Sequence, residues 1–128
     1  MKKFFMTLAV AAVLASCSDN DETDNCIEFR NEGIEAVELV PTTDMIGYAY
    51  RMDFHCMNGC GDFDSAQETV NGNTRTIKVL AKYEGCICTQ DIPARSGVYT
   101  FNPTAAGTYT LKFDKGDGTF ITKTVVKE

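Results

Sequence analysis

The feature that most constrains the fold is the alternating pattern of MIGYAYRMDFHC, residues 45–56. The even positions are all apolar: Ile46, Tyr48, Tyr50, Met52, Phe54 and Cys56. The odd positions include Arg51, Asp53 and His55. Successive side chains of a β-strand point to opposite faces, so this period of two predicts a strand with one buried face.

Other segments of the same kind follow along the chain. Residues 76–83 place Ile, Val, Ala and Tyr at odd positions, and residues 108–113 alternate Thr and Lys with Tyr, Leu and Phe. Residues 36–40 and 99–101 indicate shorter strands, and DKGDG, residues 114–118, predicts a hairpin turn into the last segment. Together these predict an all-β domain, a single sandwich of about seven strands, with an eight-stranded barrel as the alternative.

The first residues, MKKFFMTLAVAAVLASC, have the composition of an export signal. Lys2 and Lys3 precede an uncharged apolar run, residues 4–15, which is shorter than the roughly 20 residues of a membrane-spanning helix. The sequence Leu14-Ala15-Ser16-Cys17 resembles the lipobox of bacterial lipoproteins. The resemblance implies cleavage before Cys17, lipidation of that cysteine, and anchoring of the mature protein to the membrane. An ordinary signal peptide is the alternative.

The segment after Cys17, SDNDETDN, has four acidic residues and no apolar one. Such a segment has nothing to bury, which predicts a solvated tether. It is similar to the acidic export signal of surface lipoproteins in the Bacteroidota, which implies an outer-membrane protein that faces the cell exterior; a plain tether on a periplasm-facing anchor is the alternative. The expected organisation is a signal peptide at 1–16, a lipidated cysteine and tether at 17–26, and an immunoglobulin-like sandwich at 27–128.

The net charge argues against several classes of partner. The whole chain carries −6, and loss of Lys2 and Lys3 with the signal leaves 10 basic against 18 acidic residues, or about −8. Nucleic-acid binding needs clustered positive charge, so we expect no nucleic-acid partner. The same balance argues against adhesion of the domain to anionic lipid.

The stretch PTAAGTYTLKF, residues 103–113, resembles the corner that leads into the sixth strand of immunoglobulin-like domains. Tyr109 takes the position of the corner tyrosine. The core cysteine expected two residues later is replaced by Leu111. The resemblance therefore implies a sandwich without the standard disulfide between its sheets.

Five cysteines follow Cys17, and their default state in an exported domain is the disulfide. They are Cys26, Cys56, Cys60, Cys86 and Cys88. Because five is odd, one thiol is left unpaired or pairs between molecules, and 15 frameworks with two bridges remain open. The clusters 56–60 and 86–88 follow two predicted strands and can face each other, and a bridge between them would close a loop of about 30 residues, worth roughly 3 to 4 kcal/mol.

A metal site is the alternative use of these cysteines. His55, Cys56, Cys60, Cys86 and Cys88 provide an imidazole and four sulfurs, a donor set that suits zinc or copper. Strand alternation opposes it, since Cys56 points inward and His55 outward. Free thiols are a third option, but no Cys-x-x-Cys of the thioredoxin kind and no second histidine is present to lower a thiol pKa.

No catalytic motif stands out, because any Ser-His-Asp or Cys-His arrangement would have to use the sole histidine. We therefore expect a non-enzymatic, surface-exposed module that binds a protein or glycan partner or has a structural role. Its binding loops are predicted at 57–69 and 89–97. The candidate contact residues are Asn58, Asp62, Gln90 and Arg95. The main alternative is a zinc- or copper-binding lipoprotein; an enzyme or enzyme inhibitor is a third.

Overall fold

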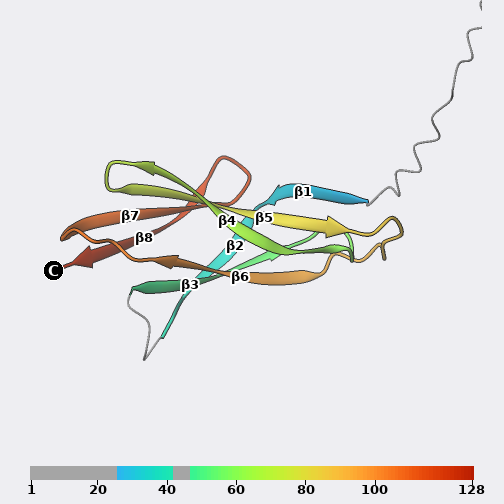
Figure 1. Ribbon diagram of the computed structural model, residues 1–128, viewed down its shortest axis with the longest axis horizontal. Helices are drawn as coiled ribbons and strands as arrows, with labels where there is room; N and C mark the ends of the chain where they lie inside the picture. The colour runs from blue at the N-terminus through green and yellow to red at the C-terminus, as the bar shows by residue number, and fades with distance from the viewer. Residues whose placement is uncertain (1–25, 42–46) are drawn as a thin grey trace, which may run out of the picture.

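The computed structural model describes residues 26–41 and 47–128, and in these ranges the chain forms eight strands (Figure 1). They are β1 Ile27–Glu32, β2 Ile34–Val40, β3 Tyr48–His55, β4 Gly61–Asn71, β5 Thr74–Glu84, β6 Ala94–Phe101, β7 Gly107–Asp114 and β8 Phe120–Lys127. The predicted all-β class is confirmed, with eight strands where about seven were expected. Within the described ranges, no helix has the length and apolar character to cross a membrane. The predicted signal peptide, Cys17 and most of the predicted tether lie outside these ranges.

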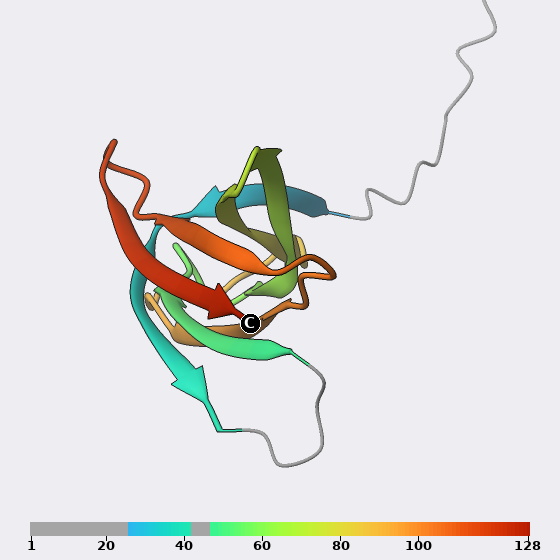
Figure 2. The same cartoon turned by 90° about the vertical axis from the view of Figure 1, so that its left-hand side faces the viewer.

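The strands form two sheets, which decides between the two predicted architectures in favour of a sandwich. The smaller sheet has the order β2–β3–β6, and all its pairs are antiparallel. The larger sheet contains β1, β4, β5, β7 and β8. In the end-on view of Figure 2, β3 and β6 lie below β7 and the β4–β5 hairpin, so that the two sheets enclose the core between them.

Strand β5 organises the larger sheet because it has three neighbours. β4 pairs with it along nearly its whole length. On its other side, β1 pairs antiparallel with residues 79–84, and β7 pairs in parallel with residues 74–77. The chain therefore brings the start of β1, the end of β5 and the start of β4 to one end of the sandwich.

The alternating residues fill the core as predicted. Tyr50, Met52, Phe54 and Cys56 are buried, as are the odd positions of residues 77–83. Ile46 lies outside the described residues. The core cluster consists of Ile34, Val37, Tyr50, Met52, Phe54, Cys56, Ile77, Val79, Ala81, Tyr83, Tyr99, Phe101, Tyr109, Leu111, Phe113 and Val125. Both sheets contribute to it, which explains why every long alternating segment has one apolar face.

The corner predicted at residues 103–113 is present. The Tyr109 hydroxyl donates a hydrogen bond to the Ala105 carbonyl at 2.8 Å, so the side chain closes the turn that enters β7. Leu111 occupies the position of the usual inter-sheet cysteine, as predicted, and it is fully buried. Packing alone holds the two sheets together at this position.

Strands β1, β4 and β6 differ from the sequence prediction. β1 was not predicted as a separate strand, and the loop predicted at 57–69 ends where β4 begins, at Gly61. β4 was not predicted as a strand for two reasons. Its register shifts between Phe63 and Ser65, which breaks the period of two, and most of its side chains are exposed. Similarly, the loop predicted at 89–97 ends at Ala94, where β6 begins.

Candidate functional site

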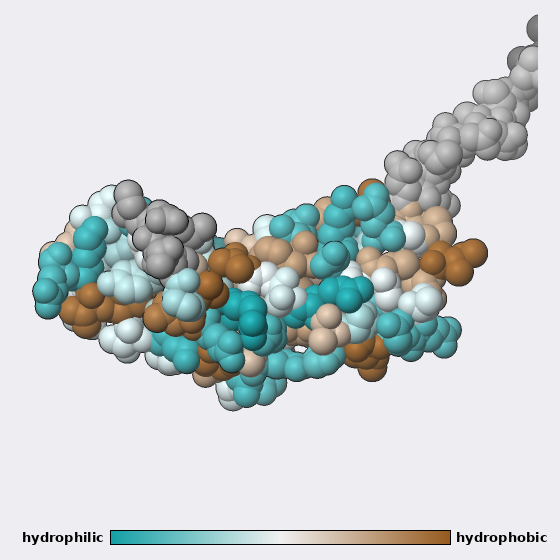
Figure 3. Space-filling model, turned by 90° about the horizontal axis from the view of Figure 1, so that it is seen from below, coloured by the Kyte–Doolittle hydropathy of each residue, from teal (hydrophilic) through white to brown (hydrophobic). Residues whose placement is uncertain are grey.

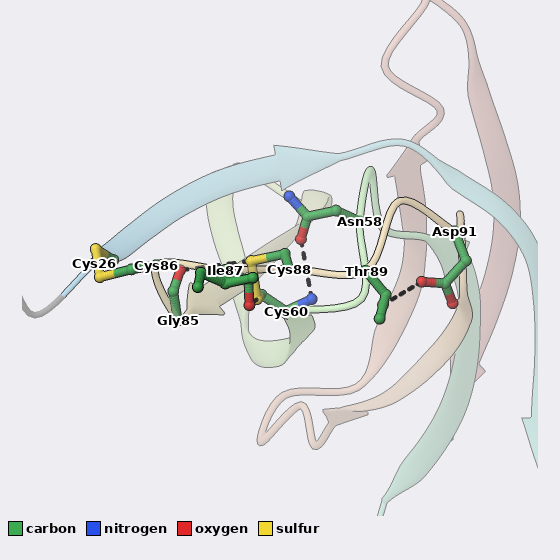
Figure 4. Close-up of a disulfide and its surroundings, with 9 residues drawn as sticks. All are labelled: Cys26, Asn58, Cys60, Gly85, Cys86, Ile87, Cys88, Thr89 and Asp91. Carbon is green, nitrogen blue, oxygen red and sulfur yellow. Dashed lines mark hydrogen bonds between the residues drawn. A yellow bond between two sulfur atoms is a disulfide. The ribbon is translucent and has the colours of Figure 1, made fainter.

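Two disulfides gather three segments at one end of the sandwich, which we call the cystine end: Cys26, residues 56–60 and residues 85–93. Cys26 is bonded to Cys86 and Cys60 to Cys88, with Cα–Cα distances of 5.0 and 5.3 Å. Figure 4 shows the two bridges on either side of Ile87. Each bridge spans many residues, 60 and 28 respectively. The cystines therefore join the start of β1 and the start of β4 to the single connection between β5 and β6.

Backbone hydrogen bonds complete the fixation of residues 85–93. The Gly85 amide donates to the Cys26 carbonyl at 2.9 Å, and the Gly59 amide donates to the Thr89 carbonyl at 2.9 Å. At the far end of the segment, the Cys56 amide donates to the Pro93 carbonyl at 3.0 Å. The segment has no regular secondary structure between Gly85 and Pro93, yet its backbone is held at both ends and at its middle.

Cys56 is the one free cysteine among the described residues, and it is fully buried. Burial raises the pKa of its thiol, because the thiolate would lose its hydration there. A Cβ on Gly61 would lie 2.7 Å from the Cys56 sulfur, so a larger residue at position 61 has no room. Cys56 is thus a small apolar core residue, and the raised pKa of its thiol disfavours reactivity.

The buried Tyr83 hydroxyl links the loop 56–60 to β1. It accepts a hydrogen bond from the Met57 amide at 2.9 Å and donates one to Glu32 at 2.5 Å. Burial, with the bond to Glu32 next in effect, raises the pKa of Tyr83 well above its usual range. The tyrosine therefore stays protonated at neutral pH and acts as a structural bridge.

The cystine end presents hydrophobic side chains to solvent. Ile87 is 95% exposed, the highest value among the exposed large hydrophobic residues of the described chain, and Ile92 and Met57 are 68% and 51% exposed. Figure 3 shows hydrophobic residues protruding at the end of the molecule where β1 begins. None of these side chains is required by the core.

The structure does not assemble the predicted metal-ligand set. Cys60, Cys86 and Cys88 are in disulfides, so their sulfurs are not free thiolates. His55 points away from buried Cys56 and contacts Glu35, with 2.8 Å between His55 Nδ1 and Glu35 Oε2. In residues 26–41 and 47–128, no group of three or more His, Cys, Asp or Glu side chains is arranged to hold a metal ion.

The four candidate contact residues all lie at or near the cystine end. Asn58 accepts a hydrogen bond from the Cys60 amide at 3.0 Å and so shapes its own loop. Asp62 and Arg95 stand at the starts of β4 and β6 and form an ion pair at 4.0 Å; Arg95 also donates to the Gly61 carbonyl at 3.0 Å. Gln90 is exposed in the loop 85–93.

Comparison with known proteins places this sandwich in a family. A model of the ORF11 beta-sandwich domain matches residues 51–126, more than half of the chain. The chain belongs to the ORF11 beta-sandwich domain family. The ORF11 match begins within β3 and ends within β8, so it contains the Cys60–Cys88 bridge but excludes β1 and Cys26. No curated protein and no solved structure matches the chain.

Sequence reasoning identified the cysteines but missed two properties of this site. The bond between Cys26 and Cys86 was one of many open pairings, because no strand had been predicted to carry Cys26 beside the end of β5. The exposure of Ile87 was missed as well, although its position between two cysteines was a usable signal. Its two neighbours in sequence, Cys86 and Cys88, are both in disulfides, which fix the backbone on either side of it.

Proposed function

We propose that this chain is a lipid-anchored, non-enzymatic module displayed on the outer face of the outer membrane, where it binds a protein or glycan or has a structural role. The observation that carries the proposal is the lipobox-like sequence Leu14-Ala15-Ser16-Cys17, followed by an acidic tether. The two disulfides of this sandwich support it, since disulfides form and persist in exported proteins.

The chemistry of the described residues supports a non-enzymatic role. The sole histidine, His55, is on the surface and contacts Glu35. The free thiol of Cys56 is buried, and its pKa is raised rather than lowered. Neither group is therefore a nucleophile activated by an adjacent base, and a binding role is the simpler proposal.

The proposed contact surface is built from the loops that the two disulfides fix. Asn58, Asp62, Gln90 and Arg95 provide amide, carboxylate and guanidinium groups at this end. Because the loop backbones are already ordered, binding would cost little conformational entropy, which is the advantage of a preorganised surface. Amide and charged groups of this kind suit the hydroxyls of a glycan or the polar rim of a protein interface.

To test the anchor, the full chain is expressed in a bacterium that processes lipoproteins. The intact mass of the protein recovered from the membrane fraction is then measured. We expect a chain that starts at Cys17 and carries the mass of the lipid, and accessibility to protease added to whole cells. A Cys17→Ala variant is the control and should lose both the lipid and the membrane association. An unmodified Cys17 would refute the anchor, and protection from protease in intact cells would refute surface display.

Thiol alkylation without reduction tests the cysteine assignment in the same preparation. We expect no alkylation of the native lipidated chain and one alkylated thiol, Cys56, after unfolding. Several thiols that become reactive only after a chelator is added would instead support the metal-binding alternative.

A further inference from the structure

The position of Cys26 relates the cystine end to the proposed anchor. Only eight residues, 18–25, separate Cys17 from Cys26. An extended chain spans at most about 3.3–3.6 Å per residue, so Cys26 lies within roughly 30 Å of the lipidated residue. Cys26 is bonded to Cys86, and Ile87 is the residue that follows Cys86. Ile87 is therefore close to the point where the tether joins the domain. An anchor at Cys17 therefore keeps the cystine end within reach of the membrane. The chain end of β8 lies at the opposite end of the sandwich (Figure 1).

The side chains at this end have the character of a surface that contacts lipid. Ile87, Ile92 and Met57 are more than half exposed. Residues 85–93 contain no lysine or arginine, and Asp91 is their one charged residue. The basic residues on the adjoining strand ends, Lys82 and Arg95, form ion pairs with Glu84 and Asp62. Exposed aliphatic groups beside paired charges favour the apolar part of the interface rather than anionic headgroups.

The fixed backbone and the short tether make even a weak contact effective. Two cystines hold Ile87 in its protruding position, so no ordering of the loop is needed when it meets the bilayer. A tether of this length keeps the domain at an effective concentration of the order of millimolar near the membrane. A contact of a few side chains, too weak to recruit a free protein, can then orient an anchored one.

We propose that the cystine end is a membrane-contact surface, and that Ile87 enters the headgroup region of the bilayer in which the lipid of Cys17 is embedded. Ile92 and Met57, from the same pair of loops, contribute apolar area. The proposal rests on the anchor proposed above, and it assigns the cystine end to the bilayer in place of the protein or glycan partner considered there. The end that carries the tyrosine corner then faces away from the membrane. Zwitterionic lipid is the favoured surface, because Asp91 and the net negative charge of the chain disfavour anionic headgroups.

Tryptophan fluorescence tests this directly, because the natural chain contains no tryptophan. An Ile87→Trp variant of the full chain, purified in lipidated form, is placed in phosphatidylcholine vesicles with brominated acyl chains. We expect emission at shorter wavelength and quenching by bromine. The matched control is Val126→Trp, since Val126 is 58% exposed near the end of β8. Its emission should stay at long wavelength without quenching.

Equal quenching of the two variants, or quenching of neither, would overturn the proposal; the second result would leave a protein partner as the occupant of the cystine end. Replacing part of the phosphatidylcholine by phosphatidylglycerol should reduce the quenching at position 87. An increase there would contradict an apolar contact.

Failure of the anchor can be separated from failure of the contact. If the mass of the natural chain shows no lipid, Cys17 of a chain that starts at residue 17 can be coupled to a maleimide-bearing lipid, since Cys56 is buried and the other cysteines are in disulfides. Quenching at position 87 in those vesicles would support the contact while the natural anchor is refuted. Its absence would refute both.

Discussion

The cystine end and the opposite end of the sandwich hold their loops by different means. At the cystine end, two disulfides fix loops whose side chains face solvent. At the opposite end, the Tyr109 hydroxyl donates a hydrogen bond to the Ala105 carbonyl. The ring centroids of Phe101 and Tyr109 are 5.2 Å apart, and the Arg75 guanidinium lies within 6 Å of both centroids. We call this second region the corner end.

The difference shows where a small domain needs covalent bonds. The corner end buries aromatic rings, and this burial stabilises its loops directly. Residues 85–93 bury almost nothing, so no comparable gain is available to order them. A disulfide supplies the missing stability chiefly by restricting the unfolded chain, which requires no buried surface. Loops whose side chains do not pack in the core can then carry exposed side chains such as Ile87.

Removal of a disulfide has the largest expected effect. A Cys26→Ala/Cys86→Ala variant should lose about 4.3 kcal/mol and a Cys60→Ala/Cys88→Ala variant about 3.6 kcal/mol of unfolding free energy, because the first bridge closes the longer loop. Urea denaturation of the two variants beside the natural chain measures both losses. The reverse order would show that loop closure is not the main source of stability at the cystine end.

Truncation of a buried ring at the corner end should have a nearly equal effect without any change in covalent structure. Phe101→Ala should cost about 3 kcal/mol, because Phe101 is 4% exposed and packs against Tyr109. Phe29→Ala is the matched control on β1, where Phe29 is 52% exposed, and should change the unfolding free energy little. Similar losses in thermal or urea unfolding of the two variants would contradict the contrast between the ends.

Removal of the corner hydroxyl tests the contribution of a single hydrogen bond. Tyr109→Phe keeps the ring but deletes the 2.8 Å bond to Ala105, which should cost about 1 kcal/mol. Tyr48→Phe is the control, because the Tyr48 hydroxyl donates to the Val126 carbonyl at 3.3 Å on the exposed surface and should matter less. A larger loss at position 48 than at 109 would argue that the corner does not stabilise this end.

The smallest effect is expected for the most exposed residue of the cystine end. Ile87→Ser should change the unfolding free energy by less than about 0.5 kcal/mol, since Ile87 is 95% exposed. Ile77→Ala, at a fully buried isoleucine, should cost about 3 kcal/mol in the same assay. A clear loss for Ile87→Ser would mean that this side chain supports the fold and is not kept for contact with another surface.

Much of the fold follows from local patterns. The strands predicted at residues 45–56 and 76–83 have the expected buried face over the residues that the structure describes, because the period of two is a property of neighbouring residues. Tyr109 was recognised as a corner residue for a similar reason, since its partner, Ala105, lies four residues away. β4 was missed because its bulge interrupts the same local signal.

The candidate site depended on contacts between distant residues and was predicted only in part. The sequence marked all five cysteines and favoured disulfides between the clusters 56–60 and 86–88, and the Cys60–Cys88 bridge agrees with that expectation. It did not identify Cys26 as the partner of Cys86. The metal-ligand set failed to form because three of its five members are in disulfides and His55 faces away from Cys56.

The sequence by itself determined the all-β class and the inward faces of its long strands, because both depend on spacing along the chain. Only the tertiary structure decided that β5 pairs with β1 and β7 on one side, and that Cys56 is the free cysteine among the residues that the structure describes. The physical reason is that strand pairing carries Cys26 to the end of β5 across 60 residues. A disulfide forms between cysteines that the fold brings within reach, whatever their separation in sequence.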